Sequence, residues 1–144
     1  MPKTPLYYED VKIGDEAPAL TVPRLSRTQI VRYAGASGDF NPIHHDEKFS
    51  IRAGNETVFA HGMLSMGLMG KMLTDWVGDG NLRNFRVRFM NRVWPMDTVT
   101  YKAVVTDKRE ENGASIISAD LYAESQHGDR TIEGSMRAAL PRRH

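Results

Sequence analysis

Cysteine is missing from all 144 residues of this sequence. Its absence excludes disulfide bonds, thiolate nucleophiles and cysteine-ligated zinc, and it is compatible with a reducing cytoplasm. Also missing is an apolar run long enough to span a bilayer, because polar residues interrupt the most apolar stretch, residues 63–77. The polar N-terminus, which carries acidic residues, does not resemble a signal or transit peptide. We therefore expect a cytoplasmic protein without a membrane span.

An excess of charge of one sign is missing as well. The 19 Lys and Arg residues nearly balance the 18 Asp and Glu residues, giving a formal net charge of +1. This balance is not the electrostatic footprint of a nucleic-acid-binding protein, so we expect no nucleic-acid partner. Internal repeats, low-complexity tracts and linker-like changes of composition are also lacking. With 40% hydrophobic residues, residues 1–144 are expected to form one domain.

The first third of the chain carries the signals of a short helix followed by a stiff loop. Ser26 and Gln29 fit a capping box, which predicts a helix over residues 27–37. The segment 33–46, YAGASGDFNPIHHD, contains the end of this helix and the loop. Pro42 prevents the loop from returning to helix, because proline has no amide hydrogen and a fixed backbone angle.

The middle of the chain has apolar residues on nearly every face of one predicted helix. They are Met63, Leu64, Met66, Leu68, Met69, Met72, Leu73, Trp76 and Val77. Such a helix is expected to be buried, with its methionines mainly in the core and one or two touching a substrate. Gly67 and Gly70 are unfavourable in a helix by about 1 kcal/mol each. We therefore expect another backbone to pass close to the helix there.

After Gly80 the apolar pattern changes from helical to alternating, as in Phe85, Val87 and Phe89. Strands are expected near residues 85–89, 99–105, 114–124 and 131–140, with turns at 110–113 and 126–129. Antiparallel strands that follow one apolar helix predict an α+β protein, in which an antiparallel sheet wraps around one long buried central helix.

The densest group of acid–base side chains lies in the segment 33–46. Asp39 and His44 are separated by a proline-containing loop, so both can face one pocket and activate a water molecule. Asn41 is placed to hold the loop in shape by hydrogen bonding to the backbone. The alternative for this motif alone is structural, with Asp39 capping a turn and His44 packing as a loop histidine.

A second candidate feature is Ala60-His61-Gly62, at the predicted start of the central helix. Free amides and the helix dipole at a helix start favour developing negative charge. Gly62 allows a substrate to approach its backbone N–H, although a helix-start glycine without a chemical role is the alternative. An acid–base pair beside an oxyanion-binding amide suits proton chemistry next to a thioester carbonyl.

A metal site is the competing interpretation of the histidines. His44, His45, Asp46 and His61 supply ligand-type side chains, but adjacent His44 and His45 need an unusual backbone to converge on one ion. We therefore expect no metal.

Three blocks of the sequence resemble the MaoC-like dehydratases, the (R)-specific enoyl-CoA hydratases of the hot-dog fold. YAGASGDFNPIHHD is similar to the hydratase-2 motif, FAHGMLSMGLMGKM to the oxyanion turn and central helix, and RVRFMNRVWPMDTV to the following strand and turn. The blocks occur in the family's order and extend the resemblance over nearly the whole chain. Met96 departs from the pattern, because the family usually has glycine in a Pro-Gly-Asp turn there.

The resemblance implies a hot-dog fold and the reversible addition of water to trans-2-enoyl thioesters, giving (R)-3-hydroxyacyl thioesters. Asp39 and His44 match the catalytic pair, Asn41 the supporting amide and Gly62 the oxyanion donor. No cofactor is implied beyond the coenzyme A or acyl carrier protein that carries the acyl group as a thioester.

Four further residues are expected to support or bind the substrate. His61 and Met63 flank Gly62, and Arg86 and Arg88 lie on the first long strand. The two arginines are either part of a solvated sheet face or receive the phosphates of coenzyme A or the acidic surface of acyl carrier protein.

The resemblance also implies a homodimer whose two sheets join edge to edge, with the pocket at the dimer interface. Higher-order assembly and pairing with another hot-dog chain are alternatives. A non-catalytic acyl-thioester-binding subunit is expected to lack Asp39 or His44, and a hot-dog thioesterase to lack the whole motif. Both therefore rank below a hydratase.

Overall fold

The computed structural model describes residues 5–143. Its elements are η1 (Tyr8–Asp10), β1 (Leu20–Val22), α1 (Arg27–Ser37), η2 (Pro42–His44), α2 (Glu47–Arg52), α3 (Gly62–Val77), β2 (Leu82–Phe89), β3 (Val99–Glu111), β4 (Ala114–Ser125) and β5 (Arg130–Leu140). Within these residues, no helix has both the length and the apolar character that crossing a membrane requires.

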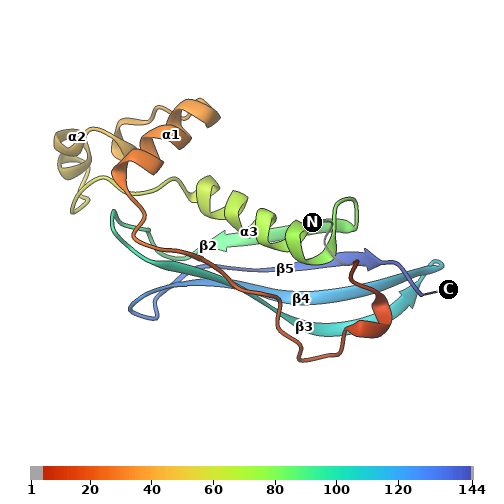
Figure 1. Ribbon diagram of the computed structural model, residues 1–144. Helices are drawn as coiled ribbons and strands as arrows, with labels where there is room; N and C mark the ends of the chain where they lie inside the picture. The colour runs from red at the N-terminus through yellow and green to blue at the C-terminus, as the bar shows by residue number, and fades with distance from the viewer. Residues whose placement is uncertain (1–4, 144) are drawn as a thin grey trace.

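One antiparallel sheet of five strands forms the body of the molecule. Its strand order is β1-β3-β4-β5-β2, and every neighbouring pair runs antiparallel. The helix α3 lies along one face of the sheet, while α1 and α2 lie together beyond the N-terminal end of α3 (Figure 1). The predicted α+β class and the hot-dog arrangement of a sheet around a central helix are therefore confirmed.

The core lies between α3 and the sheet. Met69, Leu73 and Val77 are fully buried on the side of α3 that faces the strands. Tyr101 and Leu121 are among the buried side chains that the strands contribute. Alternate residues of β3 are buried along its first half, as the period of a half-buried strand requires.

The predicted burial of α3 holds for the side that faces the sheet, and the other side is open in the single chain. Met63 is 55% exposed, and Gly67 and Lys71 are also exposed. No other atom lies within 4 Å of a Cβ built at Gly67, so the expected close backbone is absent from the described residues there. At Gly70 the close neighbour is the Phe85 ring, at 3.2 Å, rather than a backbone.

The predicted helix signals in the first third of the chain are confirmed. The Ser26 hydroxyl accepts from the Gln29 amide at 3.2 Å, and the Gln29 side chain accepts from the Ser26 amide at 2.7 Å. The helix α1 ends at Gly38, which adopts a left-handed φ of 74°. These signals fix where α1 delivers the chain into the loop that carries Asp39.

The turn at Met96 forms despite the unusual residue. Met96 has a φ of 73°, in the left-handed region that favours glycine. The Asp97 amide donates to the Trp94 carbonyl at 3.1 Å, and the Met96 amide donates to the Leu25 carbonyl at 2.7 Å. The turn between β2 and β3 is therefore held by backbone hydrogen bonds while Met96 is strained.

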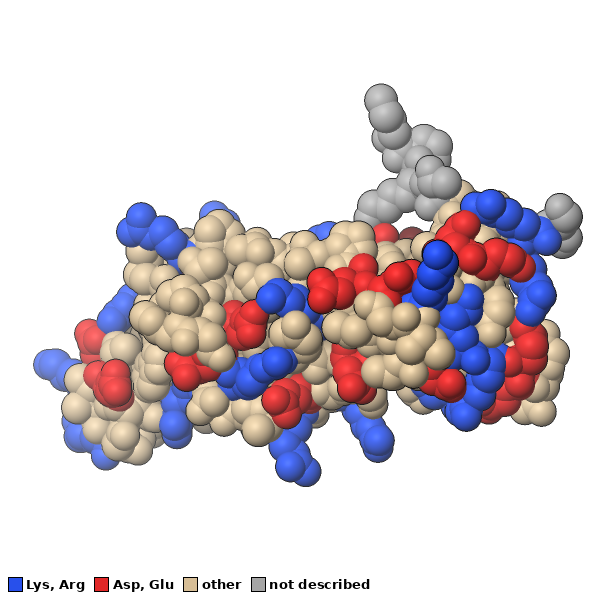
Figure 2. Space-filling model, turned by 90° about the horizontal axis from the view of Figure 1, so that it is seen from below, with Lys and Arg blue, Asp and Glu red and all other residues tan. Residues whose placement is uncertain are grey.

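The face of the sheet opposite α3 is charged and mixed in sign. Lys102 pairs with Glu124 at 2.7 Å, and Arg137 pairs with Glu111 at 2.5 Å. Figure 2, which views the molecule from below, shows Lys and Arg side chains interspersed with Asp and Glu. This pattern is typical of a solvated sheet face.

Candidate active site

The loop after α1 holds the Asp39 carboxylate in a defined orientation. The Asp39 amide donates to the Ser37 hydroxyl, and the Asn41 amide donates to Asp39 Oδ1, both at 3.2 Å. The Asn41 side chain accepts from the Ile43 amide at 3.2 Å, so Asn41 shapes the loop as its residue type predicts. Asp39 Oδ2 is left to face the neighbouring histidines.

His44 is buried beside this carboxylate with one ring nitrogen already engaged. Its Nδ1 lies 2.7 Å from the Phe59 carbonyl, which can only accept, so Nδ1 carries the hydrogen. The neutral ring therefore presents Nε2 as an acceptor, 3.9 Å from Asp39 Oδ2. Burial lowers the pKa of His44, the Phe59 hydrogen bond opposes the lowering, and the nearby His61 reinforces it.

His61 joins the start of α3 to the loop that carries Asp39. Its Nε2–H donates to the Asp39 carbonyl at 3.0 Å, and its ring stacks on His44 with the centroids 3.8 Å apart. The edge of Tyr33, from α1, completes the aromatic contact at 4.9 Å. His61 is 2% exposed, and its Nδ1 is buried without a hydrogen-bond partner among residues 5–143.

The separation of the two acceptors suits a shared water molecule. Two hydrogen bonds of about 2.8 Å from one water place their acceptors roughly 4 to 4.5 Å apart. Asp39 Oδ2 and His44 Nε2 lie 3.9 Å apart, too far for a direct hydrogen bond between them. Because the Asp39 side chain is 51% exposed, water can reach it from solvent.

Asp39, His44 and His61 also lie close enough together to be considered as metal ligands. One ligand atom from each of Asp39, His44 and His61 lies within 4.8 Å of the others. His61 Nε2, however, is committed to a backbone carbonyl, and stacked rings direct their nitrogen lone pairs side by side rather than at one point. His45 is not part of the cluster, because its Nε2 bonds the Phe40 carbonyl at 3.0 Å. The arrangement therefore fits a bound water better than an ion.

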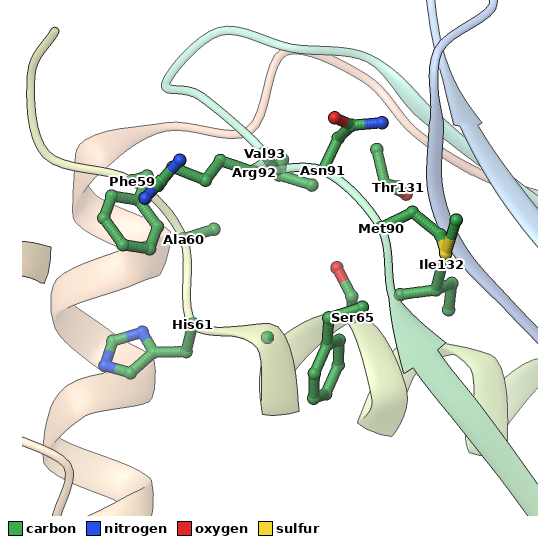
Figure 3. Close-up of a pocket in the computed structure, with 12 residues that line it drawn as sticks. Phe59, Ala60, His61, Ser65, Met90, Asn91, Arg92, Val93, Thr131 and Ile132 are labelled. Atoms are coloured by element: carbon green, nitrogen blue, oxygen red, sulfur yellow. The ribbon is translucent and has the colours of Figure 1, made fainter. Parts of the chain in front are cut away.

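A pocket of about 400 Å³ opens beside Gly62, at the start of α3. It is lined by Phe59, Ala60, His61, Gly62, Ser65, Phe89, Met90, Asn91, Arg92, Val93, Thr131 and Ile132. Figure 3 shows the Ser65 hydroxyl pointing into the pocket and the His61 ring pointing away from it. Asp39 and His44 do not line the pocket, and His61, which stacks on His44, forms the boundary.

A side chain at Gly62 would be tightly placed. A Cβ built at this position lies 3.1 Å from the Phe89 ring. Gly62 is also the first residue of α3, where backbone amides have no partner within the helix. A substrate oxygen in the pocket can therefore approach this amide closely.

Three of the predicted substrate-binding residues are not brought to this pocket. Met63 is exposed on the open side of α3. Arg86 and Arg88 alternate with the inward-facing Phe85 and Val87, so they lie on the opposite face of β2, where Arg88 borders a separate hollow. A binding role for these residues in the same chain is not supported by their positions and stays a prediction.

Ser65 and its partner Tyr101 are site residues that the sequence analysis missed. Ser65 is 5% exposed and lines the pocket, and the Tyr101 hydroxyl donates to it at 3.2 Å. A serine one turn after Gly62, in the otherwise apolar first half of the helix, was the available signal. Tyr101 looks like an ordinary core residue of an alternating strand, so its sequence context carries no such signal.

Comparisons with known proteins place this chain among hydratase sequences of similar length. The chain is 36% identical over 102 residues to an (R)-specific enoyl-CoA hydratase from Rhodospirillum rubrum, and the match covers 69% of each protein. It is 30% identical over 114 residues to the 3-oxo-4,17-pregnadiene-20-carboxyl-CoA hydratase beta subunit of Mycobacterium tuberculosis, covering 76% of this chain and 85% of that relative.

Solved structures and a family model agree with these relatives. The (R)-hydratase from A. caviae involved in PHA biosynthesis superposes with a TM-score of 0.82 at 27% identity, covering 92% of this chain and 99% of that one. The ChsH1-ChsH2 complex from Mycobacterium tuberculosis shares the fold, with a TM-score of 0.78 at 23% identity. The model of the MaoC like domain matches residues 10–125, most of the sequence. The chain therefore belongs to the MaoC-like dehydratase family.

Proposed function

We propose that this chain catalyses the (R)-specific addition of water to trans-2-enoyl thioesters, and the reverse dehydration of (R)-3-hydroxyacyl thioesters. The observation that carries the proposal is the pair of acceptor atoms on Asp39 and His44, 3.9 Å apart, which His61 joins to the pocket at Gly62 by stacking on His44. Hydratases among the named relatives support the same reaction class.

In the proposed reaction, Asp39 and His44 bind the attacking water and transfer its proton. Water hydrogen-bonded to Asp39 Oδ2 and His44 Nε2 is polarised by both acceptors. As its oxygen bonds to C3 of the enoyl group, its O–H bond breaks and the Asp39–His44 pair takes the proton. The pair returns one proton to C2, the double bond becomes single, and the protonation state of the pair is unchanged after turnover.

Negative charge develops on the thioester oxygen while C3 is attacked. The start of α3 carries the positive end of the helix dipole and unpaired backbone amides. Gly62 N–H is the donor that we assign to this oxygen, because Gly62 lines the pocket and is bordered by Phe89. Such preorganised donors are usually the largest single contribution to catalysis of this kind.

The substrate is proposed to arrive as a thioester of coenzyme A or acyl carrier protein, with no other cofactor. Arg92 stands at the rim of the pocket with its guanidinium 5.1 Å from the Phe59 ring centroid. Among the described residues it has no carboxylate partner within salt-bridge distance. A cation in this position is available to the anionic part of the carrier.

The active form is proposed to be a homodimer joined through β2. This strand pairs only with β5 among the described strands, so its second edge is unpaired. Beside it lie the exposed Phe89, Met90 and Met63, which are 50%, 44% and 55% exposed. Pairing this edge with the same edge of a second copy satisfies the strand and covers apolar surface.

A hetero-oligomer with another hot-dog chain is the second candidate for the assembly. One relative is named as a beta subunit, and one structural neighbour is a complex of two different chains. Because this chain carries both Asp39 and His44, we propose that it is catalytic on its own. Activity of the purified single chain separates the two assemblies.

The proposed function is tested by the hydration of crotonyl-CoA, followed as loss of enoyl absorbance. The expected product is (R)-3-hydroxybutyryl-CoA, identified by chiral chromatography. His44→Ala should remove most of the activity while the circular dichroism spectrum stays unchanged. An (S)-configured product, or no reaction with enoyl thioesters of any chain length on either carrier, contradicts the proposal.

A further inference from the structure

The pocket beside Gly62 has a polar side chain on its helical wall. Ser65 is 5% exposed, lines the pocket and directs its hydroxyl into it (Figure 3). Much of the surrounding wall is apolar, with Ala60, Val93 and Ile132 among its residues. A buried hydroxyl in such surroundings requires hydrogen-bond partners, because unpaired polar groups in an apolar environment are costly.

The hydrogen bond from Tyr101 leaves the hydroxyl hydrogen of Ser65 unused. The Tyr101 hydroxyl donates to Ser65 Oγ at 3.2 Å. Within residues 5–143, the bond from Tyr101 is the one hydrogen bond of the Ser65 side chain, although helix serines often donate to a carbonyl one turn back. Burial raises the pKa of Tyr101, so this phenol stays protonated and remains the donor. The free Ser65 hydrogen is therefore available to a ligand in the pocket.

Helix geometry directs the Ser65 hydroxyl and the Gly62 amide toward the same end of α3. The two residues are three positions apart, and side chains of an α-helix lean toward its N-terminus over the preceding turn. The Ser65 hydroxyl therefore reaches back over the turn that begins with Gly62, whose amide also faces toward the N-terminus. Both groups border the same pocket of about 400 Å³.

We propose that the Ser65 hydroxyl is a second donor to the thioester oxygen, acting beside the Gly62 amide. This inference rests on the proposed hydratase function. The Tyr101 hydroxyl polarises Ser65 by donating to its oxygen, and hydrogen bonds in such a chain strengthen one another. Ser65 is thus a catalytic residue that touches the substrate, and Tyr101 is a positioning residue that acts through it.

The test compares three variants of the full-length protein with crotonyl-CoA as substrate. Ser65→Ala is expected to lower kcat about 10²-fold, the usual effect of removing one oxyanion donor. Tyr101→Phe keeps Ser65 and should lower kcat by a smaller factor, between about twofold and tenfold. Thr74→Ala is the matched control, because this hydroxyl of the same helix bonds the Gly70 carbonyl and does not line the pocket. It should leave kcat unchanged.

Two further measurements separate catalysis from a structural role. Removal of a donor that acts mainly in the transition state lowers kcat and kcat/KM together and leaves KM nearly unchanged. S-butyl-CoA, a thioether without the carbonyl oxygen, should inhibit the wild type and Ser65→Ala equally. Thermal unfolding identifies any variant whose fold has been lost. If Ser65→Ala does not fold, Tyr101→Phe, in which α3 is unaltered, decides the outcome.

Each result has a defined meaning. A Ser65→Ala kcat within threefold of the wild type, or a loss confined to KM, overturns the role of Ser65 while the proposed hydratase function stands. A Tyr101→Phe kcat equal to the wild type removes Tyr101 from the inference and, where Ser65→Ala does not fold, overturns the inference. A wild-type protein that hydrates no enoyl thioester overturns both the proposed function and this inference.

Discussion

The imidazole of His44 shows how the surroundings of one residue shape the proposed chemistry. Its Nδ1–H is held by the Phe59 carbonyl, so only Nε2 is available to water. The ring is 7% exposed, and burial lowers its pKa. A lowered pKa keeps the ring neutral in slightly acidic solution, which is the state in which Nε2 accepts a hydrogen bond.

The pH dependence of kcat/KM follows from this lowered pKa. Protonation of Nε2 removes an acceptor from the water, so activity falls when His44 becomes charged. The acid-side midpoint of the rate profile should therefore lie below pH 6.5, the ordinary pKa of histidine. Initial rates of crotonyl-CoA hydration in constant-ionic-strength buffers provide the measurement. A half-maximal rate above pH 6.5 on the acid side is the contradicting result.

The strained backbone at Met96 gives a prediction about stability. A left-handed conformation costs an ordinary residue about 1 to 2 kcal/mol, whereas glycine adopts it readily. Met96 is 49% exposed, so little packing is lost on its removal. Met96→Gly should therefore raise the free energy of unfolding by about 1 kcal/mol in urea titrations. The control Ile13→Gly, at an exposed position without a positive φ, should bring no gain. A stability decrease in Met96→Gly would falsify the strain at this turn.

The residues of the candidate site could be predicted from the sequence where they lie close together along the chain. Asp39, Asn41 and His44 stand within six positions, and the structure places them in one loop with the expected hydrogen bonds. The stacking of His61 on His44 joins positions 17 apart, and no local pattern encodes that contact. For Arg86 the sequence left open a solvated face or a substrate-binding role, because a charged residue on a strand does not reveal which face meets the pocket.

At the scale of elements, boundaries were easier to predict than neighbours. The capping box and Gly38 define α1, and alternating residues mark β2 to β5. The strand order, with β2 paired to the last strand, depends on contacts distant in sequence and did not follow from these patterns. The apolar pattern of α3 predicted its burial but not which side meets the sheet, because the pattern does not distinguish burial by the same chain from burial by a second copy.

The pairing of β2 with β5 depends on one glycine. Gly134 lies opposite Val87, and a Cβ built there is 1.9 Å from the Arg86 carbonyl oxygen. Because that neighbour is backbone, a side chain forces the strands apart. Gly134→Ala should lower the free energy of unfolding by about 3 kcal/mol or more, at the upper end of overpacking costs.

Chemical denaturation of a matched pair measures this effect. Gly35→Ala is the control, because Gly35 lies in α1 with nothing within 4 Å of a built Cβ. Alanine is the better helix former, so the control should gain up to about 1 kcal/mol. Equal stability of Gly134→Ala and the wild type is incompatible with the close β2–β5 approach.

At the scale of the whole molecule, a second chain would pair with the open edge of β2 and cover the open side of α3. A dimer should sediment with twice the 16.2 kDa mass of the chain in analytical ultracentrifugation. Gly67 is exposed with empty space around it, so Gly67→Glu is compatible with the fold of a single chain. If a partner covers this side of α3, the variant should weaken the dimer. A fully active wild-type monomer rules out the proposed assembly.

The central claim is that the Asp39 carboxylate activates water for addition to an enoyl thioester, and Asp39→Asn tests it most directly. This variant keeps the size of the side chain and an Oδ1 that accepts from the Asn41 amide, but it removes the charge. The kcat/KM for crotonyl-CoA should fall about 10³-fold, within the range for loss of a general base. Asp46→Asn, which retains a capping side chain at α2, should keep wild-type activity. An Asp39→Asn enzyme within tenfold of the wild type would contradict the proposed mechanism.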